Sequence, residues 1–146
     1  RPAVNVGLSV SRVGGAAQTK AMKKASGSVR IDLAQYREME VFTQFSSDLD
    51  DATKEQLQYG KGLMELLKQP LCHPMSLAEQ VITLVAANKR LLLDVDTRET
   101  KDFQKRMLEF FAAEHKDIMD TINEKKVLDD AITESIVEAV KEFKSR

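Results

Sequence analysis

The sequence predicts an all-α fold, a bundle of about six or seven helices that follows one short β-strand segment. Apolar side chains recur at helical spacing from residue 29 to residue 143, and short runs of turn-forming residues divide them into segments. Strict alternation of apolar and small polar residues is confined to residues 4–11. The sequence has 146 residues, of which 42% are hydrophobic and 31% are charged, enough to bury one ordinary core.

The first segment is predicted to be a strand that ends at an arginine. Its two faces hold, in turn, Val4, Val6, Leu8 and Val10, and Asn5, Gly7, Ser9 and Ser11. Gly14 and Gly15 then end the alternation, so Arg12 stands where the strand gives way to a flexible turn. A lone strand cannot satisfy its backbone polar groups, and nothing later in the sequence offers a second one. We therefore expect an orphaned strand from a truncated domain. Its open edge predicts self-association of the fragment, or else a mobile N-terminus.

The next two segments are predicted helices joined by a break. Residues 15–25 are mostly good helix formers, and the sequence Ser26-Gly27-Ser28 interrupts or kinks them. From Val29 to Phe42 an apolar stripe with helical spacing marks the second helix. Ser46, Ser47 and Asp48 have the side chains of a turn, which ends this helix.

A third helix is predicted to begin at an aspartate and to contain two glycines. Asp50 or Asp51 can cap its N-terminus, and leucines at helical spacing follow. Gly60 and Gly62 inside this helix each cost about 1 kcal/mol relative to alanine. The helix should therefore be soft or closely packed at these positions, and residues 69–74 form the loop after it.

The remaining helices are predicted from their start signals. Ser76–Glu79 has the pattern of a capping box, and Asp96–Glu99 is predicted to open the helix that carries the phenylalanines. Residues 118–122 mark a short continuation, and the last helix begins near Asp129–Asp130. These segments complete the predicted bundle.

Composition and spacing exclude several kinds of site. The net charge of −1 gives no electrostatic reason to expect nucleic-acid binding, and no apolar run approaches the ~20 residues of a membrane span. Cys72 and His73 are adjacent, so their side chains diverge, and His115 has no partner at metal-ligand spacing; we expect no metal site. A phosphate-binding loop is also excluded, because Glu55 replaces its first glycine and Gly62 its serine or threonine.

Several sequence motifs resemble the alpha subunits of F-type ATP synthases. Pro2-Ala3-Val4-Asn5 followed by Ser9-Val10-Ser11 is similar to the alpha/beta signature, and residues 12–23 continue it in the alpha form. Residues 33–38, 42–50 and 66–70 also match alpha subunits. The resemblance implies that residues 1–14 are the terminal strand and arginine-finger turn of the nucleotide-binding domain. Residues 15–146 would then form the C-terminal helical domain.

The resemblance assigns a catalytic role to Arg12. It implies that this residue is an arginine finger, which reaches the catalytic nucleotide on the adjacent beta subunit. A planar cation of this kind stabilises the negative charge that develops on a transferred phosphoryl group. Ser9 and Ser11 would then belong to the same subunit interface. The residues alone, without the motif, favour a solvated surface arginine at a strand end for Arg12. The serines could equally be small polar residues tolerated on a strand.

A second interface is implied for the turn between the second and third predicted helices. Phe45, Ser46, Ser47 and Asp48 resemble the alpha-subunit loop near the rotating gamma subunit, with Ser46 where glycine is usual. The alternative is a plain turn between helices. Another departure from the family lies at residues 87–94, where the usual glycine is missing and the helix is predicted to run further.

The implied function is that of the non-catalytic alpha subunit of a proton-translocating ATP synthase. Its partners would be the beta and gamma subunits, with no nucleic acid and no direct insertion into the membrane. ATP, ADP and Mg²⁺ would be bound by the full complex and no cofactor by this fragment. The complex would lie at the cytoplasmic face of a bacterial membrane, or at its mitochondrial or chloroplast equivalent. The alternatives are a stand-alone helical interaction module, with an accidental N-terminal signature, and a sister ATPase subunit with its own catalytic site.

Overall fold

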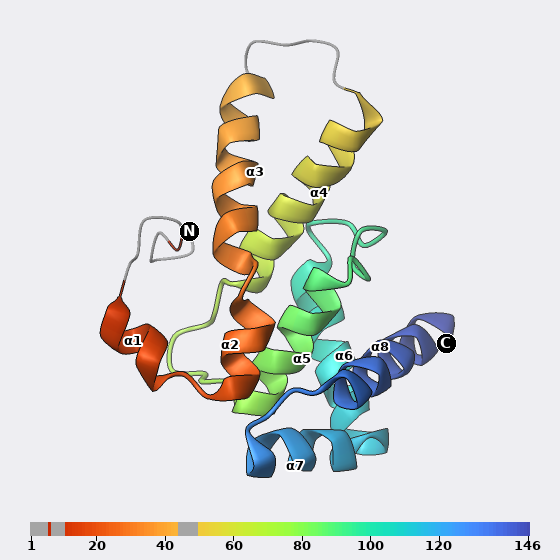
Figure 1. The fold of residues 1–146 in the computed structure, drawn as a ribbon. Helices are drawn as coiled ribbons and strands as arrows, with labels where there is room; N and C mark the ends of the chain where they lie inside the picture. The colour runs from red at the N-terminus through yellow and green to blue at the C-terminus, as the bar shows by residue number, and fades with distance from the viewer. Residues whose placement is uncertain (1–5, 7–10, 44–49) are drawn as a thin grey trace.

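The computed structural model describes residue 6 and residues 11–43 and 50–146. This part of the protein is all α-helical, as the sequence predicts, and contains eight helices (Figure 1). Their bounds are α1 Arg12–Ala17, α2 Lys20–Ser26, α3 Val29–Thr43, α4 Asp51–Leu66, α5 Leu77–Asn88, α6 Thr100–Glu114, α7 Lys116–Lys125 and α8 Asp130–Ser145. Most of the predicted strand lies outside the described residues; Val6, which is described, lies in a turn and packs against the core.

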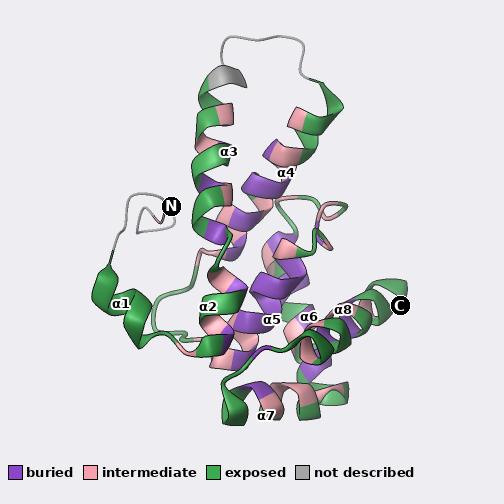
Figure 2. Cartoon of the chain, viewed as in Figure 1, coloured by how far each residue is buried: buried purple, intermediate pink, exposed green. Residues whose placement is uncertain are grey.

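Helix α5 is the centre of the fold, and the other helices pack around it. It buries eight residues that point in all directions around its axis, namely Ala78, Val81, Ile82, Thr83, Leu84, Val85, Ala86 and Ala87. Helices α2, α4, α7 and α8 all contact it, and the buried surface is concentrated around it in Figure 2. A helix that is apolar on every side is stable only where neighbours cover it completely.

The ends of this central helix are held by polar side chains. The predicted capping box is confirmed: the Ser76 hydroxyl accepts from the Glu79 N–H, and the Glu79 carboxylate accepts from the Ser76 N–H. Asn123 Oδ1 on α7 accepts from the Ala78 N–H at 3.0 Å. At the other end, Asn88 Nδ2 donates to the carbonyl of Ala25 on α2 at 2.7 Å. These bonds use polar groups that a buried helix end would otherwise leave unpaired.

The single helix predicted over residues 15–25 is wrong, because two separate helices occupy this region. Ser11 Oγ accepts from the Gly14 N–H at 2.9 Å and starts α1, which contains both glycines. Thr19 Oγ1 accepts from the Met22 N–H at 3.2 Å and starts α2. The break therefore falls at Gln18 and Thr19. Each of the two short helices has its own N-cap, Ser11 for α1 and Thr19 for α2.

Two further helix boundaries differ from the prediction. Helix α6 begins at Thr100 because Asp96 folds a turn before it, accepting the Arg98 N–H on its side chain at 2.8 Å. Helix α5 ends at Asn88, although residues 87–94 contain no glycine. Arg90 takes up the left-handed conformation itself, with φ 56°, and the backbone turns away.

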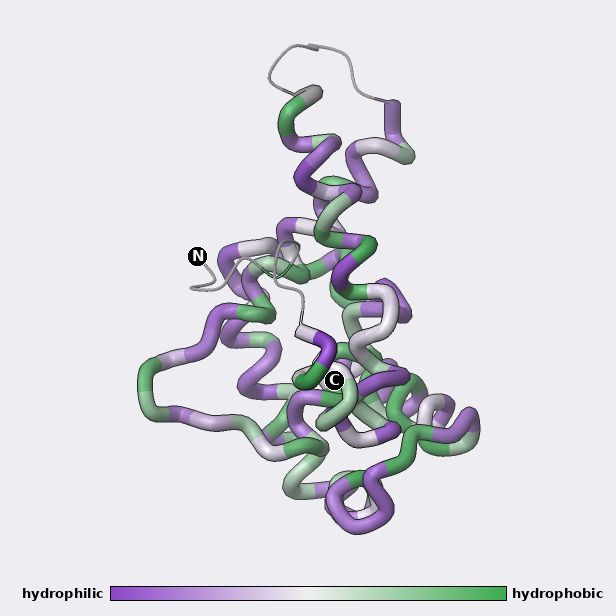
Figure 3. Tube along the Cα trace, turned by 60° about the vertical axis from the view of Figure 1, so that its left-hand side comes forward, coloured by the Kyte–Doolittle hydropathy of each residue, from purple (hydrophilic) through white to green (hydrophobic). Residues whose placement is uncertain are grey.

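Helices α3 and α4 lie side by side and form a hairpin that projects beyond the other helices (Figure 1). The predicted close packing at one glycine is confirmed, since a Cβ built on Gly60 would lie 2.3 Å from the ring of Tyr36. A Cβ on Gly62 would meet nothing within 4 Å. Hydrophilic residues predominate towards the far end of the hairpin (Figure 3). Because Gly60 has no side chain, α3 and α4 can approach closely at Tyr36.

The two glycines of α4 should respond in opposite ways to alanine. We expect Gly60→Ala to lower the free energy of unfolding by about 1–3 kcal/mol, because the methyl group collides with the Tyr36 ring. Gly62→Ala is the matched control and should raise it by up to about 1 kcal/mol through helix propensity. Urea denaturation of both variants measures the difference. Equal stabilisation by the two substitutions would mean that the ring does not constrain the helix.

Candidate functional site

Arg12 is the first residue of α1, and its side chain is exposed. This differs from the predicted position in a turn after a strand, because Ser11 caps a helix that begins at Arg12. Arg12 has no ion-pair partner within the described part of the protein. A cation at the N-terminal end of a helix also gains nothing from the helix dipole. The guanidinium therefore has no role in holding the described fold together and is open to an outside acceptor.

A groove of about 550 Å³ opens beside α1, between it and helices α2 and α3. Its lining includes the N-cap Ser11 together with Gly14 and Gly15 of α1, two cations, Lys23 and Arg30, and two residues of α5. No carboxylate belongs to the described lining. The groove thus adds positive charge and hydrogen-bonding groups next to the segment that carries Arg12.

The predicted interface residues are only partly placed. Ser11 is described, and its hydroxyl is engaged as the cap of α1. Ser9 and the four residues Phe45, Ser46, Ser47 and Asp48 lie outside the described residues. The helices before and after that second group are α3 and α4, so both ends of it join the projecting hairpin.

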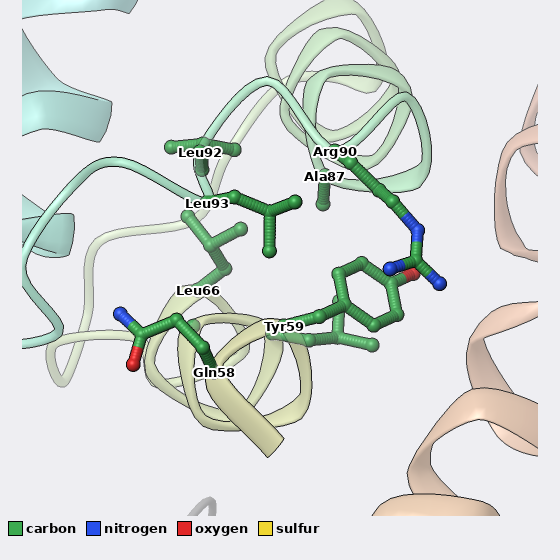
Figure 4. A pocket seen from close by; sticks show the side chains of 9 residues that line it. Gln58, Tyr59, Leu66, Ala87, Arg90, Leu92 and Leu93 are labelled. Atoms are coloured by element: carbon green, nitrogen blue, oxygen red, sulfur yellow. The ribbon is translucent and has the colours of Figure 1, made fainter. Parts of the chain in front are cut away.

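A polar cluster that the sequence did not reveal surrounds Arg90. Its guanidinium contacts Glu55 at 2.7 Å and Gln56 at 2.9 Å, and lies over the ring of Tyr59, 5.0 Å from its centre (Figure 4). Tyr59 in turn donates its hydroxyl to Asp32 on α3 at 2.9 Å. The cavity beneath these side chains is about 10 Å³, room for one water molecule at most. The cluster therefore connects three helices and is no ligand pocket.

Both tyrosines of the protein lie in the α3–α4 hairpin, where their surroundings favour the neutral form. Burial raises the pKa of Tyr59, and the hydrogen bond to Asp32 raises it further, while Arg90 partly opposes the shift. Burial, followed by the hydrogen bond to Glu40, raises the pKa of Tyr36 to about 12. Each hydroxyl donates to a carboxylate, so ionisation would bring two negative charges together.

Another groove of about 580 Å³ lies between the α4–α5 connection and α6. Lys101 lies at its wall and donates to the carbonyl of Leu66 at 3.0 Å and to Gln104 Oε1 at 2.9 Å. Burial lowers the pKa of Lys101. Because the ammonium group of Lys101 donates to the carbonyl of Leu66, the last residue of α4, it satisfies an acceptor at the C-terminal end of that helix.

Thiol or metal chemistry finds no centre among the residues that the structure describes. Cys72 is exposed and has φ 61°. His115 packs against the rings of Phe110 and Phe111, and its Nε2 lies 3.3 Å from Glu142 without hydrogen-bond geometry. Within the described ranges, no three His, Cys, Asp or Glu side chains gather in a way that could hold a metal ion. The residues present here do not fit a Mg²⁺ site.

Length and hydropathy also bear on whether any described helix could span a membrane. None of these helices is both long and apolar enough to cross a bilayer.

Comparison with known proteins gives a consistent match. The family model for "ATP synthase alpha/beta chain, C terminal domain" matches residues 18–143. This match begins after the N-terminal signature and therefore does not depend on Arg12 or the residues before it.

Individual relatives match over almost the whole sequence. ATP synthase subunit alpha of Petrotoga mobilis is 50% identical over 98% of this protein and 28% of the relative. The subunits alpha of Desulfovibrio desulfuricans and Thioalkalivibrio sulfidiphilus are both 51% identical, over 99% and 100% of this protein and 29% and 28% of their own length. The sequence thus spans less than a third of the length of these relatives.

The raised tyrosine pKa values predict how stability depends on alkaline pH. The stabilisation is fully present below the unfolded pKa of 10.0 and is lost as the pH rises through the folded value, about 12 for Tyr36. Tyrosinate absorbance should therefore appear at higher pH in the folded protein than in urea, and the free energy of unfolding should fall over this interval. The protein has two tyrosines and no tryptophan, so Tyr59→Phe isolates the Tyr36 step. Coincident titrations of the folded and unfolded protein would contradict the prediction.

Proposed function

Because the protein belongs to the family of ATP synthase alpha/beta C-terminal domains, we propose that it serves as the C-terminal part of the non-catalytic alpha subunit of a proton-translocating F-type ATP synthase. The observation that carries this proposal is the identity of about half of all residues with alpha subunits along the whole sequence. The family match over residues 18–143 argues against an accidental N-terminal signature in an unrelated helical module.

In this proposal, Arg12 acts on a nucleotide held by an adjacent beta subunit. Its exposure, and its lack of an ion-pair partner within the described residues, support a role outside its own subunit. The guanidinium would stabilise the negative charge that spreads over the oxygens of the transferred phosphoryl group. ATP, ADP and Mg²⁺ would be bound by other parts of the complex; among the described residues no three His, Cys, Asp or Glu side chains gather in a way that could hold a metal ion. Ser9 and Ser11 would lie in the same interface.

The second proposed partner is the gamma subunit, and we assign the contact with it to residues 45–48. The support is the resemblance of this acidic segment to alpha subunits and its position in the sequence between α3 and α4, the helices of the projecting hairpin. Through its partners the protein would be peripheral to the membrane, at the cytoplasmic face of a bacterial cell.

Steady-state ATP hydrolysis by the complex tests the role of Arg12. With Arg12→Lys in the full-length subunit, we expect turnover to fall roughly a thousandfold or more, because lysine keeps the charge but loses the planar fork. Arg98→Lys, at another exposed arginine, is the matched control and should leave turnover unchanged. Assembly and nucleotide affinity should persist in both. Normal turnover of the Arg12 variant in an assembled complex would show that the residue has no catalytic role.

Cross-linking tests the proposed gamma contact. With Cys72 replaced by glycine, we expect Ser47→Cys in the assembled complex to form a disulfide with cysteines placed along the gamma subunit. The control Glu134→Cys lies on an exposed position of α8 and should form none. Equal cross-linking at both positions, or at neither, would refute the assignment of residues 45–48.

A further inference from the structure

The end of helix α5 is built on an arginine where helices usually have a glycine. The Arg90 N–H donates to the carbonyl of Ala87 at 2.8 Å, and the Leu91 N–H donates to that of Ala86 at 3.0 Å. This pair of bonds is a Schellman motif, whose left-handed residue is Arg90, with φ 56°. A non-glycine residue in this conformation is strained, so its presence calls for a compensating role.

The Arg90 side chain reaches across to helix α4 and engages it at three positions along one face. Glu55 and Gln56 accept from its guanidinium at 2.7 Å and 2.9 Å, and Tyr59 lies beneath it. Tyr59 passes the connection on to α3, through its hydrogen bond to Asp32. The arginine at the end of α5 thus touches α4 directly, where Figure 4 shows it over the Tyr59 ring, and reaches α3 through the Tyr59–Asp32 hydrogen bond.

The hairpin needs such a connection because its outer part lies away from the main core. Leu63 and Leu66, in the second half of α4, belong to the continuous core cluster. Leu57 and Tyr36 are buried but do not belong to that cluster, so they pack within the hairpin. The first half of α4 therefore meets the body through polar contacts with the α5–α6 connection, among them Arg90 and the Gln58 amide, which donates to the carbonyl of Val95 at 3.5 Å.

We propose that Arg90 forms a clamp with Glu55, Gln56 and Tyr59 of α4, and through Tyr59 with Asp32 of α3. The clamp fixes the inclination of the α3–α4 hairpin against α5, with Arg90 as the positioning residue. Through these contacts, Arg90 at the strained end of α5 holds the hairpin at one angle to α5. Whether the clamp also positions the contact with the gamma subunit rests on the proposed function, because the residues assigned to that contact lie in the sequence between the two helices of this hairpin. The clamp itself is a property of this protein alone and can be tested without any partner.

Arg90→Gly is the decisive variant, because glycine suits the left-handed position and removes the side chain that reaches α4. In hydrogen exchange of the isolated protein, we expect the amides of residues 54–59 to exchange about tenfold faster or more. The amides of α5, α7 and α8 should keep their protection. With spin labels at the exposed positions Glu38 and Lys105, in a Cys72→Gly background, the distance distribution should broaden.

Two further variants separate the clamp from a general loss of stability. Glu55→Ala with Gln56→Ala removes both α4 acceptors of the Arg90 guanidinium without touching the end of α5, and should reproduce both changes. Lys89→Ala removes the neighbouring exposed cation and should reproduce neither. Unchanged exchange and distances in both clamp variants, or a uniform loss of protection in every helix, would overturn the proposal. Since no partner is present, failure here leaves the Arg12 and gamma assignments untouched.

Discussion

The burial of helix α5 on all sides of its axis is the constraint on which the rest of the structure depends. Eight of its residues are buried in all directions around its axis, so helices must cover every side before it is stable in water. The covering helices come from distant parts of the sequence: α2 before it, and α7 and α8 after it. Asn88 and Asn123 hold the ends of α5 to α2 and α7, so the same neighbours provide both the apolar contacts and the polar ones.

The outer part of the α3–α4 hairpin does not cover α5. The free-energy cost of the Arg90 conformation can be compared there with the gain from its contacts with α4. The left-handed conformation of Arg90 costs about 1–2 kcal/mol. An exposed ion pair such as the one with Glu55 contributes about 0.2–1 kcal/mol, and a cation–π contact such as the one with Tyr59 about 0.5–1 kcal/mol. The gain and the cost nearly cancel, so Arg90 adds little net stability. Its proposed effect is on the position of the outer part of the hairpin, because the inner part is already held by the core cluster through Leu33, Leu63 and Leu66.

The sequence predicted features set by near neighbours along the backbone and missed those set by distant ones. The Ser76–Glu79 capping box, the Asp129 cap and the close packing at Gly60 were all predictable, because local spacing or glycine alone indicates them. The end of α5 was not, since a left-handed arginine is accepted there through contacts with residues 34 and 35 positions earlier in the sequence. Of the candidate site, the sequence supplied the residues through family resemblance, while the structure supplied the exposure of Arg12 and its place in a helix.

Both proposed contact regions are carried by segments that contribute little to the hydrophobic core. Helix α1, which carries Arg12, buries none of its residues, and the outer part of the hairpin packs outside the continuous core cluster. A segment with few buried contacts can shift its position at little cost in free energy, so a partner with a preferred geometry can select that position. The hairpin differs from α1 in one respect, because Arg90 ties it to the central helix. Displacing the hairpin must therefore break the contacts with Glu55, Gln56 and Tyr59, whereas moving α1 breaks no ion pair of Arg12 within the described residues. The fold thus restrains one contact region and leaves the other to its partner.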